Sequence, residues 1–69
     1  EALAEYERVL LEHPDEVRCF VGMMDIAVRD LHDPVLAEGF YRRGCEELTD
    51  RDALEQLRQA HEEILRDFR

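Results

Sequence analysis

The amino-acid sequence predicts an all-α domain of about four helices that pack as antiparallel hairpins. Apolar residues recur at helical spacing along most of the chain, two prolines divide it into segments of helical length, and no stretch alternates apolar and polar residues as a strand would. The 69 residues are 45% hydrophobic and 39% charged, a composition that suits helices with charged outer faces. A chain of this length forms one domain at most.

The first two predicted helices lie on either side of Pro14. The second covers residues 15–31 and has Asp15 as its expected N-cap. Apolar residues occupy most of its circumference, which indicates burial on more than one side. Its polar stripe, the surface that this helix can show to water, consists of Arg18, Gly22, Asp25 and Arg29. The first covers residues 1–12, and its apolar positions are Ala2, Leu3, Tyr6, Val9 and Leu10.

The third and fourth predicted helices each begin at a recognisable start signal. An aspartate cap followed by Pro34 starts the third helix, which continues to Leu48. The capping-box-like residues 49–52, with Asp in place of the usual Glu, start a fourth helix that runs to the end of the chain. The expected inner face of the third helix comprises Ala37, Phe40, Tyr41, Gly44, Cys45 and Leu48. The apolar stripe of the fourth comprises Leu54, Leu57, His61, Ile64 and Phe68.

The first and third predicted helices have similar residues at a fixed offset in the sequence. Tyr6 and Tyr41 lie 35 positions apart, and the same offset aligns Ala2 with Ala37. Fixed offsets of this size are typical of helical arrays. In the first segment the small residue Ala2 is followed by an aromatic four positions later and by Pro14 twelve positions later, a pattern that resembles the second helix of a tetratricopeptide repeat.

The resemblance covers about residues 1–49 and departs from the family pattern at several positions. Met24 replaces the usual Gly or Ala, Ala27 replaces the usual aromatic, and Thr49 stands where proline is expected. A small helical bundle is therefore the alternative, since it shares the same helices and differs in their stacking.

The array interpretation divides the chain into three parts, which are a partial repeat contributing its second helix (1–13), one full repeat (15–48) and a capping helix (50–69). A repeat buries its faces against its neighbours, so the resemblance implies that the chain is a fragment of a longer protein or dimerises.

The family resemblance also implies a binding surface, because the first helix of each repeat lines a groove that receives a partner peptide. In this register the groove residues are Arg18, Val21, Gly22, Asp25, Val28 and Arg29. Two arginines beside a bare glycine could clamp an acidic side chain or a C-terminal carboxylate, with the two valines offering apolar contact. Alternatively, Asp25 and Arg29 form an ordinary i,i+4 surface pair and Arg18 is only solvated. The leading hypothesis is thus a protein–protein interaction module.

A second hypothesis is an oligomerisation or structural element of a larger protein. The apolar stripe of the fourth helix has heptad-like spacing over about two heptads. If this helix pairs with a second copy, His61 would lie at the seam and make a homo-oligomer sensitive to pH. The same stripe would otherwise cover the end of the helical domain.

Charge and composition argue against several other functions. The net charge of −9 disfavours nucleic acid and anionic membrane surfaces as partners. Two cysteines outside any C-x-x-C pair indicate a reducing compartment, and we expect a cytoplasmic protein. The three histidines fall on different segments, so the sequence predicts no metal, no cofactor and no enzymatic activity in this chain.

Overall fold

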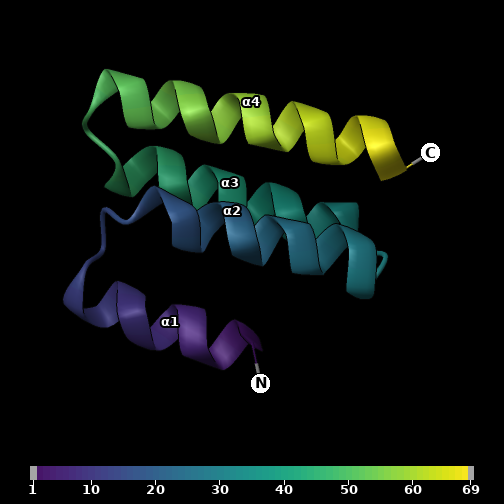
Figure 1. Cartoon of the computed structure of the whole chain (residues 1–69), viewed down its shortest axis with the longest axis horizontal. Coiled ribbons are helices and arrows are strands. Elements are labelled where there is room, and N and C mark those ends of the chain that lie inside the picture. Colours follow the sequence, from purple (N-terminus) through teal and green to yellow (C-terminus); the bar gives the residue numbers. More distant parts are fainter. Residues whose placement is uncertain (1, 69) are drawn as a thin grey trace.

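The computed structural model describes residues 2–68 and contains four α-helices, each antiparallel to the next along the chain (Figure 1). Within these residues there is no strand, which confirms the prediction of an all-α fold with about four helices. The helices are α1 (Ala2–Glu12), α2 (Val17–Asp25), α3 (Pro34–Glu47) and α4 (Arg51–Phe68), and a short π-helical turn, η1 (Ile26–Asp30), continues α2.

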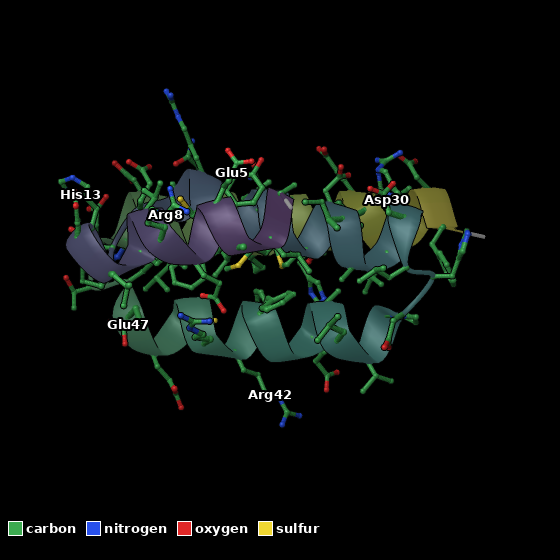
Figure 2. The ribbon with its side chains drawn as sticks, turned by 90° about the horizontal axis from the view of Figure 1, so that it is seen from below. Glu5, Arg8, His13, Asp30, Arg42 and Glu47 are labelled. Carbon is green, nitrogen blue, oxygen red and sulfur yellow. The ribbon has the colours of Figure 1, made fainter. Side chains whose placement is uncertain are left out.

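Three of the helices share one layer, and the fourth covers one of its faces. Helices α1, α2 and α4 lie side by side, whereas α3 lies to one side of all three (Figure 2). After α2 the chain runs back along α3 before it forms α4. Helices α2 and α4, which are neighbours in space, therefore run in the same direction (Figure 1). The result is a thin slab with extents of 32 × 27 × 14 Å.

The core is centred on α2 and η1, which pack against the other three helices. Its largest fully buried side chains are Phe20, Met23, Met24, Leu57 and Val28. All but one of these come from the second predicted helix, which is therefore buried on more than one side. The two methionines fill the interior, as flexible thioether side chains commonly do.

Local hydrogen bonds explain where the helices begin. The backbone N–H of Leu36 donates to Asp33 Oδ1 at 3.1 Å and Pro34 opens α3, as predicted. At α4 the backbone N–H of Ala53 donates to Asp50 Oδ2 at 3.2 Å, so the cap lies one residue after the expected Thr49.

The start of α2 also differs from the prediction. Its N-cap is Glu16, whose side chain makes no capping hydrogen bond, and Asp15 lies outside the helix. The cause is a turn at Pro14 and Asp15, closed by a 3.1 Å hydrogen bond from the Glu16 N–H to the carbonyl oxygen of His13. Because this turn occupies Asp15, the helix begins only at Val17.

The end of the second predicted helix widens into the π-helical turn. The N–H of Leu31 donates to the carbonyl of Ile26 at 3.1 Å, and the N–H of Asp33 donates to that of Ala27 at 2.8 Å. Between them His32 has a φ of 52°, the one non-glycine residue with positive φ among those described. This left-handed residue turns the chain from η1 toward the start of α3.

Two predicted inner faces are narrower than expected. On α3 the thiol-bearing Cys45 is exposed, and Phe40 and Tyr41 are only half-buried. Helix α3 covers the layer with a stripe that contains Ala37, Gly44 and Leu48, and Cys45 lies about 100° around the helix from Gly44. On α1, which packs chiefly against α2, only Leu10 is fully buried and Val9 remains 41% exposed.

Candidate functional site: a groove between α2 and α4

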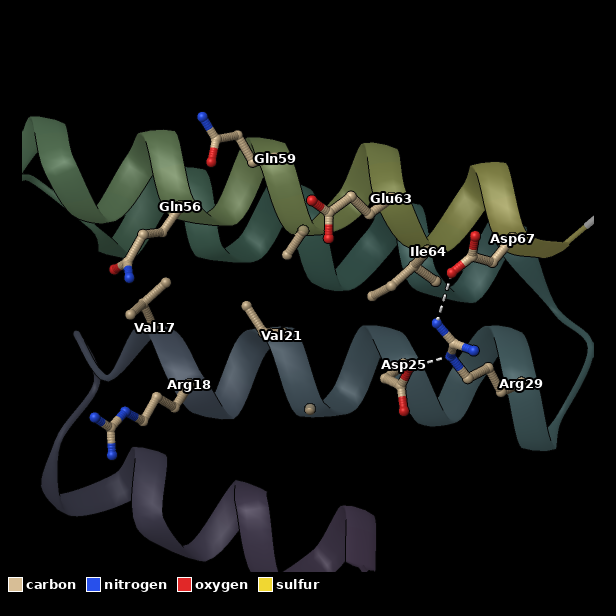
Figure 3. A pocket seen from close by; sticks show the side chains of 12 residues that line it. Val17, Arg18, Val21, Asp25, Arg29, Gln56, Gln59, Glu63, Ile64 and Asp67 are labelled. Atoms are coloured by element: carbon tan, nitrogen blue, oxygen red, sulfur yellow. Dashed lines mark hydrogen bonds and ion pairs between the residues drawn. The ribbon is translucent and has the colours of Figure 1, made fainter.

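A groove of about 560 Å³ runs between the parallel helices α2 and α4, with α3 behind them (Figure 3). From the second predicted helix it is lined by Val17, Arg18, Val21, Gly22, Asp25 and Arg29. From α4 it is lined by Gln56, Gln59, Ala60, Glu63, Ile64 and Asp67. The groove therefore brings together two segments that are far apart in the sequence.

Of the six residues assigned to a partner-binding groove from the sequence, Val28 is the exception. The other five line this groove, but Val28 is fully buried in the core and lies outside the lining. Its expected role of offering apolar contact to a partner is corrected accordingly. The physical reason is the position of Val28 around the helix axis. Val28 lies seven positions after Val21 and within the π-helical turn, where each residue turns through a smaller angle than in an α-helix. Its side chain therefore points into the core.

Gly22 lies beside α1, and its small size serves the contact between the two helices. A Cβ atom added to Gly22 would lie 2.6 Å from the hydroxyl oxygen of Tyr6 and 2.8 Å from Cε2 of the same ring. The space left by the missing side chain is thus taken by Tyr6. Gly22 contributes backbone to the groove edge while it also holds α1 in place.

Apolar side chains form the floor of the groove. Val17 and Val21 from α2 and Ala60 from α4 are half-buried, and Ile64 is 5% exposed. Small and branched side chains at these four positions leave a depression flanked by longer polar side chains. Such a surface, an apolar floor between polar rims, is typical of sites that receive an extended or helical peptide.

Arg29 closes one end of the groove. It pairs with Asp25 on the preceding turn, and its Nη2 atom donates to Asp67 Oδ2 of α4 at 3.2 Å (Figure 3). The hydrogen bond with Asp25, together with the charges of both carboxylates, raises the pKa of the Arg29 guanidinium above its ordinary value. The i,i+4 pair expected as one alternative is therefore present, and a carboxylate clamp at Arg29 would have to displace two aspartates.

The opposite end is open and carries different chemistry. Arg18 is exposed and makes no ion pair with any residue in the described range 2–68. Across from it Gln56 of α4 extends over the groove toward α2 (Figure 3). Further along the α4 rim, Glu63 is also exposed and unpaired among residues 2–68. The groove thus offers one unpaired cation and one unpaired anion on opposite rims.

The predicted oligomer seam on α4 faces the interior of this chain. Leu57 is fully buried, Ile64 is nearly so, and Leu54 is half-buried against the core. A Cβ atom added to Gly44 of α3 would lie 2.7 Å from Leu57 Cδ2, so the two helices meet closely there. Phe68 alone is 41% exposed. Pairing with a second copy through this stripe would require these side chains to leave the core.

His61, the polar member of the seam, is stacked on Tyr41 of α3. The two rings are 4.4 Å apart at an interplanar angle of 9°. Burial lowers the pKa of His61 below its ordinary value, although the charges of Glu38 and Glu62 act in the opposite direction. Its Nε2 atom is buried and has no hydrogen-bond partner among the described residues. His61 is therefore a half-buried ring whose burial favours its neutral form.

The described residues show no other candidate for chemistry. No group of three or more His, Cys, Asp or Glu side chains within residues 2–68 is arranged to hold a metal ion. Cys19 is buried, and this burial raises the pKa of its thiol. None of the helices in the described part of the chain is long and apolar enough to cross a lipid bilayer.

Sequence reasoning missed the α4 side of the groove. Gln56, Gln59, Glu63 and Asp67 follow helical spacing next to the apolar stripe of α4. The test for a polar stripe that selected Arg18 and Arg29 does not single them out, because α4 is polar over most of its circumference. What the sequence lacks is any indication that the two stripes face each other.

Comparison of the chain with protein-family profiles, with curated protein sequences and with solved structures found no match.

Proposed function

We propose that the chain is a protein–protein interaction module, a tetratricopeptide-like scaffold whose groove between α2 and α4 binds a peptide segment of a partner protein or of a neighbouring domain. The observation that carries this proposal is the groove lining: five of the six residues selected by the array register line it, opposite a polar stripe of α4. The proposed role is non-catalytic, needs no cofactor and takes place in the cytoplasm.

The two tyrosines aligned by the 35-residue offset give the array interpretation partial support. Tyr6 and Tyr41, which the 35-residue offset aligns, each lie against the helix that follows their own. Tyr6 contacts α2 at Gly22, and Tyr41 stacks on His61 of α4. The contacted positions differ, since the offset aligns Gly22 with Leu57 and not with His61. The position of α1 departs from an array, because a second helix of a repeat would share the layer of α3, whereas α1 lies level with α2 and α4 (Figure 2). The array interpretation therefore applies to α2, α3 and α4.

The dimensions of the groove suit a short segment of polypeptide. The lining residues of the second predicted helix run from Val17 to Arg29, twelve residues of rise, or about 18 Å. An extended peptide covers that length with about five or six residues. Peptides of this size achieve specificity through a few side chains placed in pockets and against rim charges.

A peptide selection tests the proposal. Displayed random peptides would be selected on the immobilised chain, and the selected sequences would be titrated against the isotopically labelled protein by NMR. We expect the backbone amides of α2 and α4 that line the groove to shift. Arg18→Glu should weaken binding severalfold, because Arg18 is exposed and unpaired among residues 2–68 and its reversal leaves the fold intact.

Arg66→Glu is the matched control, since Arg66 is an exposed arginine of α4 outside the groove lining. It makes the same change in net charge and should leave the affinity for the selected peptides unchanged. The proposal is overturned if no peptide is selected, if the shifted amides lie outside the groove, or if both reversals weaken binding equally.

A further inference from the structure

From the charges on its rims we infer that the groove recognises an extended segment of the form acidic–apolar–apolar–basic, with the acidic side chain at Arg18 and the basic side chain at Glu63. This inference rests on the proposed function and adds the chemistry of the ligand. It differs from an arginine clamp for a purely acidic tail, because only one of the two groove arginines is available.

Some of the charges that line the groove are already engaged. Arg29 pairs with both Asp25 and Asp67 at the closed end, so its positive charge is engaged by two carboxylates. Arg18 and Glu63 are the groove-lining charges that have no ion-pair partner among residues 2–68. A ligand that supplies partners to both carries one negative and one positive group.

The spacing of Arg18 and Glu63 along the groove suits an extended segment. Gln56 extends over the groove toward Val17 (Figure 3), and Glu63 follows Gln56 by seven residues, or about 10 Å along the helix axis. Arg18 directly follows Val17, so the backbone positions of Arg18 and Glu63 are about 9–10 Å apart along the helix axes. An extended chain covers this distance between residues i and i+3, at about 3.3 Å per residue.

Arg18 and Glu63 also lie on opposite sides of the groove. Side chains of an extended segment alternate between its two sides, so residues i and i+3 point to opposite sides. Arg18 belongs to the α2 side of the groove and Glu63 to its α4 side, which matches this alternation. In Figure 3 the exposed Arg18 side chain extends from α2 toward α1, so it meets an acidic group of the ligand after rotating about its side-chain bonds. The two intervening side chains would point toward Ala60 on one side and Val21 on the other. Both contacts are apolar, so apolar residues fit the middle positions.

Four capped tetrapeptides test the inference: Asp-Leu-Leu-Arg, Asn-Leu-Leu-Arg, Asp-Leu-Leu-Gln and Asn-Leu-Leu-Gln. Each would be titrated by NMR into the wild-type chain and into the Arg18→Gln and Glu63→Gln variants. Arg18→Gln should weaken the two Asp peptides about two- to fivefold, the range expected for an exposed ion pair, and leave the two Asn peptides unchanged. Glu63→Gln should do the same to the two Arg peptides and spare the two Gln peptides.

Arg66→Gln and Glu46→Gln serve as controls, because both residues are exposed and lie outside the groove lining. They should change all four affinities equally or leave them unchanged. Binding in the groove without the paired losses overturns the inference and leaves the proposed function standing. Amide shifts outside the groove, or no shifts with any of the four peptides, also overturn it, and the peptide selection then decides the proposed function separately.

Discussion

The aromatic ring of Tyr6 lies directly against the backbone of Gly22, so closely that a Cβ atom on Gly22 would lie 2.6 Å from the tyrosine hydroxyl oxygen. This contact joins the edge helix α1 to the central helix α2, beside the groove. It makes the docking of α1 depend on the absence of a side chain at one position.

Replacing that glycine should loosen α1. Gly22→Ala gains about 1 kcal/mol of helix propensity but forces the Tyr6 ring away, an overpacking cost of about 1–3 kcal/mol. Gly39 is a glycine of α3 with no atom within 4 Å of an added Cβ, so Gly39→Ala should stabilise the protein by about 0.5–1 kcal/mol. Urea unfolding should therefore separate the two variants by about 2 kcal/mol. Faster hydrogen exchange confined to α1 in Gly22→Ala would locate the effect, and equal stabilities would contradict it.

Leu57 should be a main support of the fold. It is fully buried against α3, so Leu57→Ala removes core contacts and should cost about 2–5 kcal/mol, a large share of the stability of a domain this small. Leu11 on α1 is 86% exposed, and Leu11→Ala should change the free energy of unfolding by less than about 0.5 kcal/mol.

The same unfolding experiment tests whether the apolar stripe of α4 joins two copies of the chain. If α4 serves the core of its own chain, the unfolding midpoint of the wild type should not change over a hundredfold dilution. A midpoint that falls on dilution would show that Leu57 and its neighbours on α4 stabilise an association of copies.

His61 should make the stability fall as the pH is lowered through the weakly acidic range. In the folded state burial lowers its pKa, whereas in the unfolded chain the histidine titrates near its ordinary value of about 6.5. Below that pH the unfolded chain binds a proton that the folded chain binds only at lower pH, so acidification favours unfolding. His61→Phe, which keeps a ring against Tyr41, should flatten the dependence between about pH 7.5 and 5.5. An unchanged slope in this variant would assign the dependence to other groups.

Relieving the left-handed backbone at His32 should stabilise the protein. A φ of 52° is unfavourable for a residue with a Cβ, and His32→Gly removes that cost, which outweighs the added entropy of the unfolded chain and the loss of a tilted ring contact with Phe68. We expect a net gain of about 0.5 kcal/mol in thermal or chemical unfolding. Thr49→Gly, at a loop position without positive φ, should instead lose about 0.5 kcal/mol.

Local signals in the sequence predicted local structure well. Asp33 and Pro34 are residue types that favour the start of a helix, and in the structure Asp33 is the N-cap of α3 and Pro34 is its first residue. Where two neighbouring residues competed for one role, the sequence selected the wrong one: Thr49 and Asp50 both precede α4, and only the hydrogen bond to Ala53 distinguishes them. Cys45 was misplaced for a related reason, because helical spacing does not define how wide a buried face is.

Only the α2 side of the candidate site could be predicted from the sequence. Arg18 and Arg29 belong to a polar stripe that is visible in one helix, whereas Glu63 and Asp67 belong to a second stripe whose partner is defined by packing. Which helix lies beside α2 depends on the path of the chain through α3. No residue of α4 by itself indicates that α2 is its neighbour, so the groove can be recognised only from the packed structure.

The shared direction of α2 and α4 gives the groove an electric polarity in addition to its side-chain charges. Each helix carries about half a positive charge at its N-terminus and half a negative charge at its C-terminus. Because the two helices run the same way, both N-termini lie at the Arg18 end and both C-termini lie at the Arg29 end (Figure 1). The first turns of α2 and α4 therefore favour the negative end of a bound dipole near Arg18, while α3, which runs the opposite way behind the groove, offsets part of this effect. Antiparallel helices with the same side chains would cancel it.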